Sequence, residues 1–285
     1  MALPAWLASG PRGSPTAGGP GPGASEPLPL VLLHGMGSTA SVWLPQLEHF
    51  GRSRRTLAWT MPGYGSSPPL AGGYDWDALA DALAALCDAH DLSRIHLLGH
   101  SIGGMVAQAF AHRHRGRLAS LVLSASSAGF GQASEAWKAD FLRQREEPLA
   151  RHASFAEAAP ALLSNFCAHC ISTELRALAV HAASSISTAA YLEAMRLLLT
   201  FDRAADLPRL DLPVLLLAGS DDQQAPLKAQ RRLLERLPQG RLAVLEGLNH
   251  MANLEAPARF NACIEAFLAE VEVVPAESPP QAPSL

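Results

Sequence analysis

The chain is short of two residue types, and each shortage excludes a class of protein. Lysine occurs only twice in 285 residues, and the net charge is −4, so nothing predicts a basic surface for nucleic acid or an anionic membrane. Cysteine is also sparse, which excludes a disulfide scaffold and indicates a reducing compartment. The four cysteines are Cys87, Cys167, Cys170 and Cys263.

Cys167 and Cys170 have the spacing of half a zinc or redox site. A structural zinc site needs four ligands, and no second cysteine pair or closely spaced histidine pair completes this one. Small buried thiols in a helical segment are the favoured interpretation, and no metal is expected.

Long apolar runs are lacking as well. No stretch approaches the ~20 consecutive apolar residues of a membrane-spanning helix. The N-terminus has no basic region leading into an apolar run, so no secretory signal is expected. These absences predict a soluble, cytoplasmic protein.

The ends of the chain differ in composition from its middle. Residues 1–27 are crowded with Gly, Pro, Ser and Ala, and residues 273–285 are similar, so both are expected to be flexible. Between them, short apolar runs alternate with helix-like segments over residues 28–125 and 213–272. That alternation predicts an α/β fold with a parallel sheet covered on both faces. Residues 126–212 contain no clear strand and are expected to form a helical cap over the carboxyl ends of the strands.

A candidate nucleophile lies between an expected strand, residues 95–98, and an expected helix, residues 102–114. Gly99-His100-Ser101-Ile102-Gly103 has the pattern G-x-S-x-G. A sharp strand-to-helix turn would hold Ser101 in a strained conformation with its hydroxyl exposed, and glycines on either side would avoid clashes. His100 is expected to point away from the serine and to serve as structural support.

A nucleophile of this kind needs donors for a developing oxyanion. Those expected here are the N–H of Ile102, next to the nucleophile, and the N–H of Met36 in the turn His34-Gly35-Met36-Gly37. The second lies directly after an expected strand, residues 28–33.

The acid and the base follow later strands. Asp222 lies three residues beyond Gly219 at the end of an apolar run, and Asp221 is the fallback. His250 lies in a loop after the last expected strand, and Glu255 is expected to anchor the helix that follows. The resulting order is Ser101, Asp222, His250, one of the known orders of a catalytic triad.

In these motifs the chain resembles the α/β-hydrolase fold family, and Pro62-Gly63-Tyr64-Gly65-Ser66-Ser67 is a further match. The resemblance spans roughly residues 28–270. It implies a mostly parallel sheet of eight strands with helices on both faces, a helical lid, and acyl transfer without a cofactor. Phe201-Asp202-Arg203 and the residues after it are similar to the branch containing 3-oxoadipate enol-lactonases. The family usually opens with a β-hairpin, so the Gly- and Pro-rich start predicts short or missing edge strands.

The predicted function is hydrolysis of an ester or lactone of a small organic acid. That small molecule is the expected partner, nucleic acid and membrane are not, and the sequence leaves the oligomeric state open. The cap residues Trp137 and Phe141, together with Phe166 and Trp43, are candidates for an apolar pocket. Arg143, Arg145 and Arg203 are candidates to bind a substrate carboxylate, although each also fits a solvated surface charge.

Three alternatives remain open. The same triad supports hydrolysis of a carbon–carbon bond in a ring-cleavage product. A cofactor-independent oxygenase or perhydrolase is disfavoured by the complete triad. A non-catalytic ligand receptor is disfavoured for the same reason.

Overall fold

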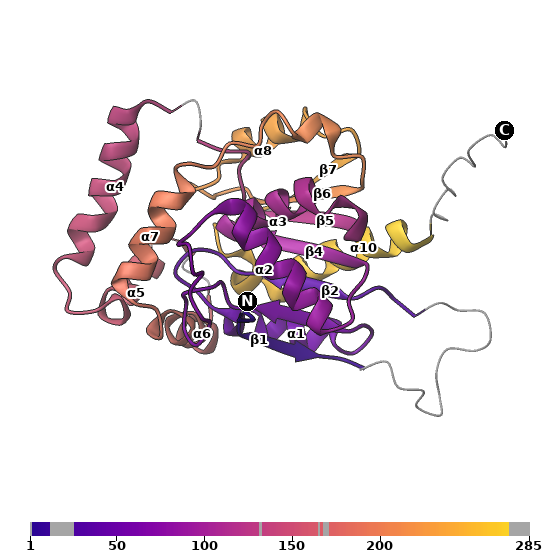
Figure 1. Cartoon of the computed structure of the whole chain (residues 1–285), viewed down its shortest axis with the longest axis horizontal. Coiled ribbons are helices and arrows are strands. Elements are labelled where there is room, and N and C mark those ends of the chain that lie inside the picture. The colour runs from indigo at the N-terminus through magenta and orange to yellow at the C-terminus, as the bar shows by residue number, and fades with distance from the viewer. Residues whose placement is uncertain (1, 12–25, 131–132, 165, 168–170, 274–285) are drawn as a thin grey trace.

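The computed structural model describes residues 2–11, 26–130, 133–164, 166–167 and 171–273. Its centre is a seven-stranded sheet in the order β1-β3-β2-β4-β5-β6-β7 (Figure 1). Only β1 is antiparallel to its neighbour. The resemblance implied eight strands, and the described residues contain seven. The strands are β1 (Trp6–Ser9), β2 (Leu30–Leu33), β3 (Thr56–Trp59), β4 (Ile95–His100), β5 (Leu118–Ser124), β6 (Val214–Gly219) and β7 (Gly240–Leu245).

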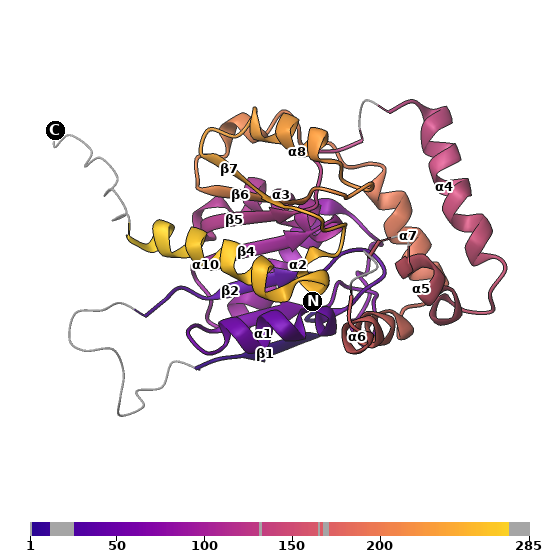
Figure 2. The same ribbon diagram turned by 180° about the vertical axis from the view of Figure 1, so that it is seen from behind.

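Helices cover both faces of the sheet (Figures 1 and 2). In the part of the chain that the structure describes, no helix combines the length and apolarity needed to cross a bilayer. The helices that flank the sheet are α1 (Leu44–Phe50), α2 (Trp76–Ala89), α3 (Ile102–Arg113), α8 (Leu227–Leu234), α9 (Ala252–Glu255) and α10 (Pro257–Val273). Three short 3₁₀ helices cover Ala40–Trp43, Arg115–Arg117 and Leu207–Arg209.

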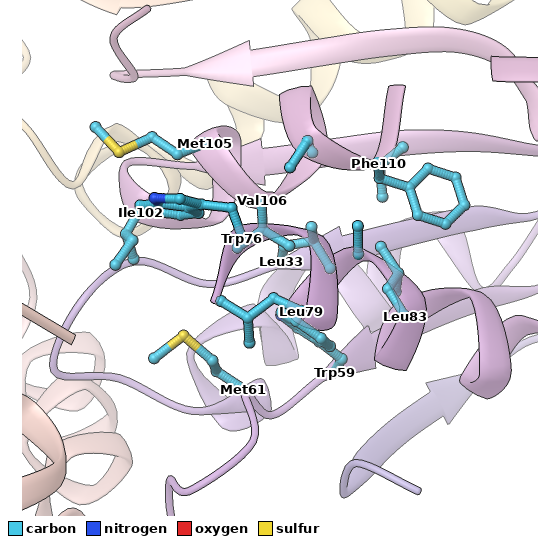
Figure 3. Packing of buried hydrophobic residues seen from close by; sticks show 14 of the residues in the cluster. Leu33, Trp59, Met61, Trp76, Leu79, Leu83, Ile102, Met105, Val106 and Phe110 are labelled. Carbon is cyan, nitrogen blue, oxygen red and sulfur yellow. The ribbon is translucent and has the colours of Figure 1, made fainter. Parts of the chain in front are cut away.

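Burial of both faces explains why the strands are continuous apolar runs. In β2, Val31 and Leu33 belong to one buried cluster, together with side chains of α2, α3 and α8. Figure 3 shows Leu33 of this cluster with Leu79 of α2 and Val106 of α3. Leu30 and Leu32 point the other way and pack with α1 and α10. Successive side chains alternate between the faces of a strand, so covering both faces requires apolar residues at every position.

Between β5 and β6 the described residues form four further helices, which lie together beyond one end of the sheet (Figure 1). Each of the four begins with a serine whose Oγ accepts a backbone N–H of the first turn. We refer to the four helices as the cap. They are α4 (Glu135–Leu149), α5 (Phe155–Ser164), α6 (Thr173–Ser184) and α7 (Thr188–Leu198).

The N-terminal segment corrects one expectation. Residues 1–27 were expected to be flexible, but Trp6–Ser9 forms β1 at the edge of the sheet, paired antiparallel with β3. The Trp6 ring lies 4.2 Å from that of His90, and the Ala5 carbonyl accepts the N–H of Thr60 at 2.6 Å. A short apolar run before the Gly-rich stretch therefore suffices for edge pairing. Residues 12–25 and 274–285 lie outside the described residues.

Glu272 fastens α10 to the amino ends of the strands. Its carboxylate accepts hydrogen bonds from both Nη atoms of Arg54, at 2.7 and 3.1 Å, and from the N–H of Leu28 at 3.2 Å. It also accepts Nε2 of the buried His96 at 3.1 Å. Burial alone would raise the pKa of Glu272, but the bonds from His96 and Arg54 outweigh it and lower that pKa to about 2. The last turn of α10 is thus held by charge-assisted bonds.

We expect Glu272→Gln to lower the free energy of unfolding by about 1.5–3 kcal/mol at pH 7, because the Arg54 side chain, which is only 10% exposed, loses its charged acceptor. The pKa of Glu272 is depressed on folding, so its contribution is complete above about pH 4.5 and lost as the pH falls toward about 2. Urea unfolding at several pH values should therefore show that the free energies of unfolding of the wild type and of Glu272→Gln converge as the pH falls.

The matched control is Glu270→Gln in the same helix. Glu270 pairs with Arg241, and both side chains are 56% exposed, so the loss should stay below about 1 kcal/mol. Equal losses for the two variants would contradict the role assigned to Glu272.

Candidate active site

Ser101 joins β4 to α3 in a backbone conformation that is rare for a residue with a side chain. Its φ is 53° and its ψ is −120°. Its N–H donates to the carbonyl of Ser124 and its carbonyl accepts the hydroxyl of Ser126, both at 2.9 Å. These bonds hold the turn, and the Ser101 side chain stays partly exposed. The expected strained turn is present.

Close approach of α3 to the sheet explains the glycines around Ser101. A Cβ on Gly103 would lie 2.5 Å from the carbonyl oxygen of Leu33, and one on Gly99 would overlap the carbonyl of Gly103. Both contacts are with backbone, which cannot move aside. Only glycine therefore allows the helix to begin directly above the strands.

Asp222 and His250 form a buried pair. Nδ1 of His250 donates to Oδ2 of Asp222 at 2.8 Å, and the other oxygen of Asp222 accepts the N–H groups of Gln224 and Ala225 at 2.7 and 3.0 Å. Burial on its own would raise the pKa of Asp222, but the bond from His250 and the two amides leave it below its usual value. The carboxylate is therefore ionised and orients the imidazole. Asp221, the fallback, is exposed and accepts the Ser220 hydroxyl.

The loop that carries His250 is held by its own neighbours. Oδ1 of Asn249 accepts the N–H of His250 at 2.8 Å, and Oε2 of Glu255 accepts the N–H of Asn249 at 2.7 Å. Glu255 was expected to anchor the helix that follows. It lies at the end of α9 and in addition fixes the residue before the base.

His34 orients the peptide that contains the Met36 amide. Its Nε2 accepts the N–H of Met61 at 3.0 Å, so its Nδ1 carries the proton and donates to the carbonyl of Gly35 at 2.8 Å. Burial lowers the pKa of His34 to about 4, which keeps this neutral tautomer. In a trans peptide the N–H points opposite to the carbonyl. The Met36 N–H therefore points away from His34.

A cavity of about 370 Å³ brings these groups together. Its wall contains Met36, Ser101 and His250, and the cap contributes the opposite side. Among the bonds of the described residues, none joins Ser101 Oγ to His250. Such bonds are often long before substrate binds. Ile102 is not part of the wall, because its side chain is buried in the core below, and only its backbone adjoins Ser101.

Comparison with known proteins places this site in a family. A model of the alpha/beta hydrolase fold matches residues 29–257. The chain belongs to the α/β-hydrolase family of enzymes.

Relatives of this hydrolase cover most of its length. A carbamate hydrolase of Stutzerimonas stutzeri is 30% identical, over 85% of this chain and 91% of the relative. The 3-oxoadipate enol-lactonase 2 of Acinetobacter baylyi is 26% identical, over 86% of this chain and 90% of the relative. A thermophilic esterase from Thermogutta terrifontis has a similar structure, with a TM-score of 0.79, 26% identity and coverage of 94% and 93%.

Three of the cap residues expected from the hydrolase sequence line the cavity. The rings of Trp137 and Phe141 lie 5.1 Å apart, and the Arg145 guanidinium carbon lies 3.4 Å from the centroid of Phe141. Phe166 also lines the cavity, with its ring 5.7 Å from that of His250. The cap side of the cavity is therefore mostly apolar with several aromatic rings, and its charged residues are Arg145 and Asp140.

Three other expected residues lie elsewhere, which corrects their predicted role. Arg143 is 59% exposed and pairs with Asp140 and Glu147, because two residues along a helix turn it to the opposite side from Arg145. Arg203 is bound by Asp77 and Asp206. Trp43 is wholly buried below the site, packed against Phe260 and edge-on to His100.

The sequence reasoning missed residues of α5 and α7 that line the cavity. Phe155, Tyr191 and Met195 are all at least 96% buried, and all contribute to the wall. The amphipathic character of the segment around Tyr191 was a usable signal, but no motif marked it.

In the described residues, no group of three or more histidine, cysteine or acidic side chains is placed to hold a metal ion. The expected thiol pair cannot be placed, since Cys170 lies outside the described residues. Cys167 itself is buried, as the favoured interpretation required.

We expect the free energy of unfolding to be about 1 kcal/mol higher for Ser101→Gly than for Ser101→Ala. The reason is that glycine adopts a positive φ without strain and alanine does not. Chemical denaturation of the two variants measures the difference. As a control, the order should reverse at Ser184, a helical position where alanine is preferred to glycine. An alanine variant as stable as the glycine variant at position 101 would mean that the turn is unstrained.

Proposed function

We propose that this protein is a serine hydrolase that cleaves an ester or lactone of a small organic acid. The observation that carries the proposal is the buried Asp222–His250 pair, bonded at 2.8 Å, which shares one cavity wall with the strained Ser101. Residues 28–125 and 213–272 would form the catalytic core, and residues 126–212 the cap that covers the substrate. The chemistry requires only protein groups, and a cytoplasmic small molecule is the proposed substrate.

The proposed mechanism has two halves. His250 takes the proton of the Ser101 hydroxyl as Oγ attacks the substrate carbonyl, and the amides of Met36 and Ile102 bind the resulting oxyanion. As the tetrahedral intermediate collapses, His250 protonates the leaving oxygen. It then removes a proton from water, which attacks the acyl-enzyme and releases the acid and free Ser101.

The names of the relatives support this reaction class. They include an enol-lactonase and an esterase, each of which cleaves an acyl–oxygen bond. Another relative is named a carbamate hydrolase, so a carbamate belongs in any test of substrates.

The position of Arg145 favours a substrate that carries a negative charge. Of the three arginines considered from the sequence, it alone lines the cavity and has no carboxylate partner among the described residues. Its Nη1 donates to the Phe141 carbonyl at 3.1 Å, and burial lowers its pKa, so its charge is incompletely solvated. A substrate carboxylate would supply the missing partner. Trp137 and Phe141 would then pack against the apolar part of the substrate.

We expect Ser101→Ala to lose at least ~10³-fold in turnover on activated esters and lactones, as removal of a triad serine does. Asp222→Asn should also lose activity, whereas Asp221→Asn, one residue away and exposed, should not. Labelling of Ser101 by a fluorophosphonate provides an independent readout. Turnover by Ser101→Ala equal to that of the wild type would refute the proposal.

The same substrate panel addresses the remaining alternatives. A vinylogous diketone run beside an enol-lactone tests carbon–carbon bond hydrolysis with the same triad. Failure of the wild type to react with the fluorophosphonate would instead favour a non-catalytic receptor.

We expect Arg145→Gln to raise KM for an ester bearing a free carboxylate by about 10- to 100-fold, the equivalent of one charge-assisted hydrogen bond. KM for the corresponding neutral amide-capped ester should stay nearly unchanged. Arg143→Gln, in the same helix but paired on the outer surface, is the matched control and should affect neither substrate. Equal changes in KM for the charged and the neutral ester would show that Arg145 does not bind the substrate carboxylate.

A further inference from the structure

The segment Gly35–Ser38, here called the oxyanion loop, is enclosed from two sides. On the core side, His34 holds the Gly35 carbonyl, and the ring of Tyr64 stacks on that of His34 at 5.9 Å. A Cβ on Gly35 would lie 2.8 Å from Cδ2 of His100. The core therefore supports the first half of the loop with three buried rings.

The cap supports the other half. Gly37 has a φ of +72°, and a Cβ there would lie 3.0 Å from Cζ of Phe155 and 3.3 Å from Cε2 of Tyr191. The two rings pack on each other with centroids 4.5 Å apart, and both are at least 96% buried. The loop is thus in direct contact with an aromatic pair from the cap.

The position of this aromatic pair depends on how the cap sits on the core. Phe155 is the first residue of α5, and Tyr191 lies in the first turn of α7. The α7 segment is tied to the core where Glu193 accepts the N–H of Tyr74 at 3.4 Å. A second tie is the bond from Nε1 of Trp76 to Thr200 Oγ1, at 3.0 Å. A shift of α7 would therefore move the contact on Gly37.

We infer that Phe155 and Tyr191 are positioning residues through which the cap holds the oxyanion loop. The inference rests on the proposed function, since the loop carries the Met36 amide assigned to the oxyanion. Without the rings, Gly37 gains space, and the Met36 N–H is held only from the side of His34. The cap then contributes to the transition state as well as to substrate selection, because oxyanion donors act only when they are pre-aligned.

The test compares Tyr191→Leu and Phe155→Leu with the wild type on the smallest activated ester, an acetate. We expect kcat to fall about 10- to 100-fold, part of the ~10²–10³-fold that loss of a whole oxyanion donor causes, with KM little changed. Affinity for a small alkyl boronic acid, which forms a tetrahedral adduct on serine, should fall by a similar factor. Tyr191→Phe keeps the ring and should keep both.

Two further variants separate loop positioning from a general loosening of the cap. Leu192→Ala changes α7 next to Tyr191 at a position outside the cavity wall, so it should spare kcat for acetate. Gly37→Ala should lose activity in the wild type, and lose less in the Phe155→Leu background, where the ring that its methyl group meets is gone.

The possible failures are distinguishable. If the wild type hydrolyses acetate esters and Tyr191→Leu does so equally well, only this inference is overturned. Equal losses in Tyr191→Phe and Tyr191→Leu would also overturn it, because the hydroxyl and not the ring would then matter. A wild type that is neither labelled nor active refutes the proposed function itself. Thermal unfolding of each variant shows whether a loss reflects misfolding.

Discussion

The structure depends on one steric constraint, the entry of α3 directly above the ends of the parallel strands. The turn at Ser101 achieves it with a φ of 53°, and a glycine at position 103 lets the helix backbone approach the carbonyl of Leu33. The same approach brings the amide of Ile102 beside the serine and sets the loop after β2 opposite it. The positions of the proposed nucleophile, of one proposed oxyanion donor and of the cavity floor therefore follow from a single turn.

The same molecule contains a second line of serine, histidine and carboxylate, which differs from the first in its surroundings. Nδ1 of His96 lies 2.7 Å from Ser120 Oγ, and its Nε2 lies 3.1 Å from Glu272. Because the carboxylate accepts a hydrogen bond from Nε2–H, Nδ1 accepts the serine hydroxyl. The order of the three groups is that of a catalytic triad, with the two ring nitrogens exchanged. Ser120 and His96 are fully buried, and Ser120 lies within an ordinary strand. Ser101 differs from Ser120 in two ways: it lines a cavity, and it lies in a strained turn. We assign a stabilising role to the cluster of Glu272, His96 and Arg54.

Features that depend on local pattern were predictable from the sequence. The strand expected at 95–98 is Ile95–His100. Ser101 and His250 line one cavity, and Asp222 is bonded to His250. Features that depend on helix rotation and docking were not. Arg143 and Arg145 look equivalent in sequence, yet one faces solvent and the other the cavity. Trp6–Ser9 is too short to show a strand pattern in the sequence. It forms a strand because β3 offers an edge with which it pairs.

The electrostatics of the site follow from which histidines are kept neutral. His100 lies 4.9 Å from His250, and burial, followed by the proximity of His250, lowers its pKa to about 3. His34, under the oxyanion loop, is neutral for the same principal reason. In the proposed mechanism His250 becomes an imidazolium when it takes the serine proton, and a positive charge on His100 would oppose that. His100 and His34 are both neutral, so neither competes with the imidazolium for the negative charge of Asp222. The ionised carboxylate, bonded directly to His250, would then stabilise the imidazolium.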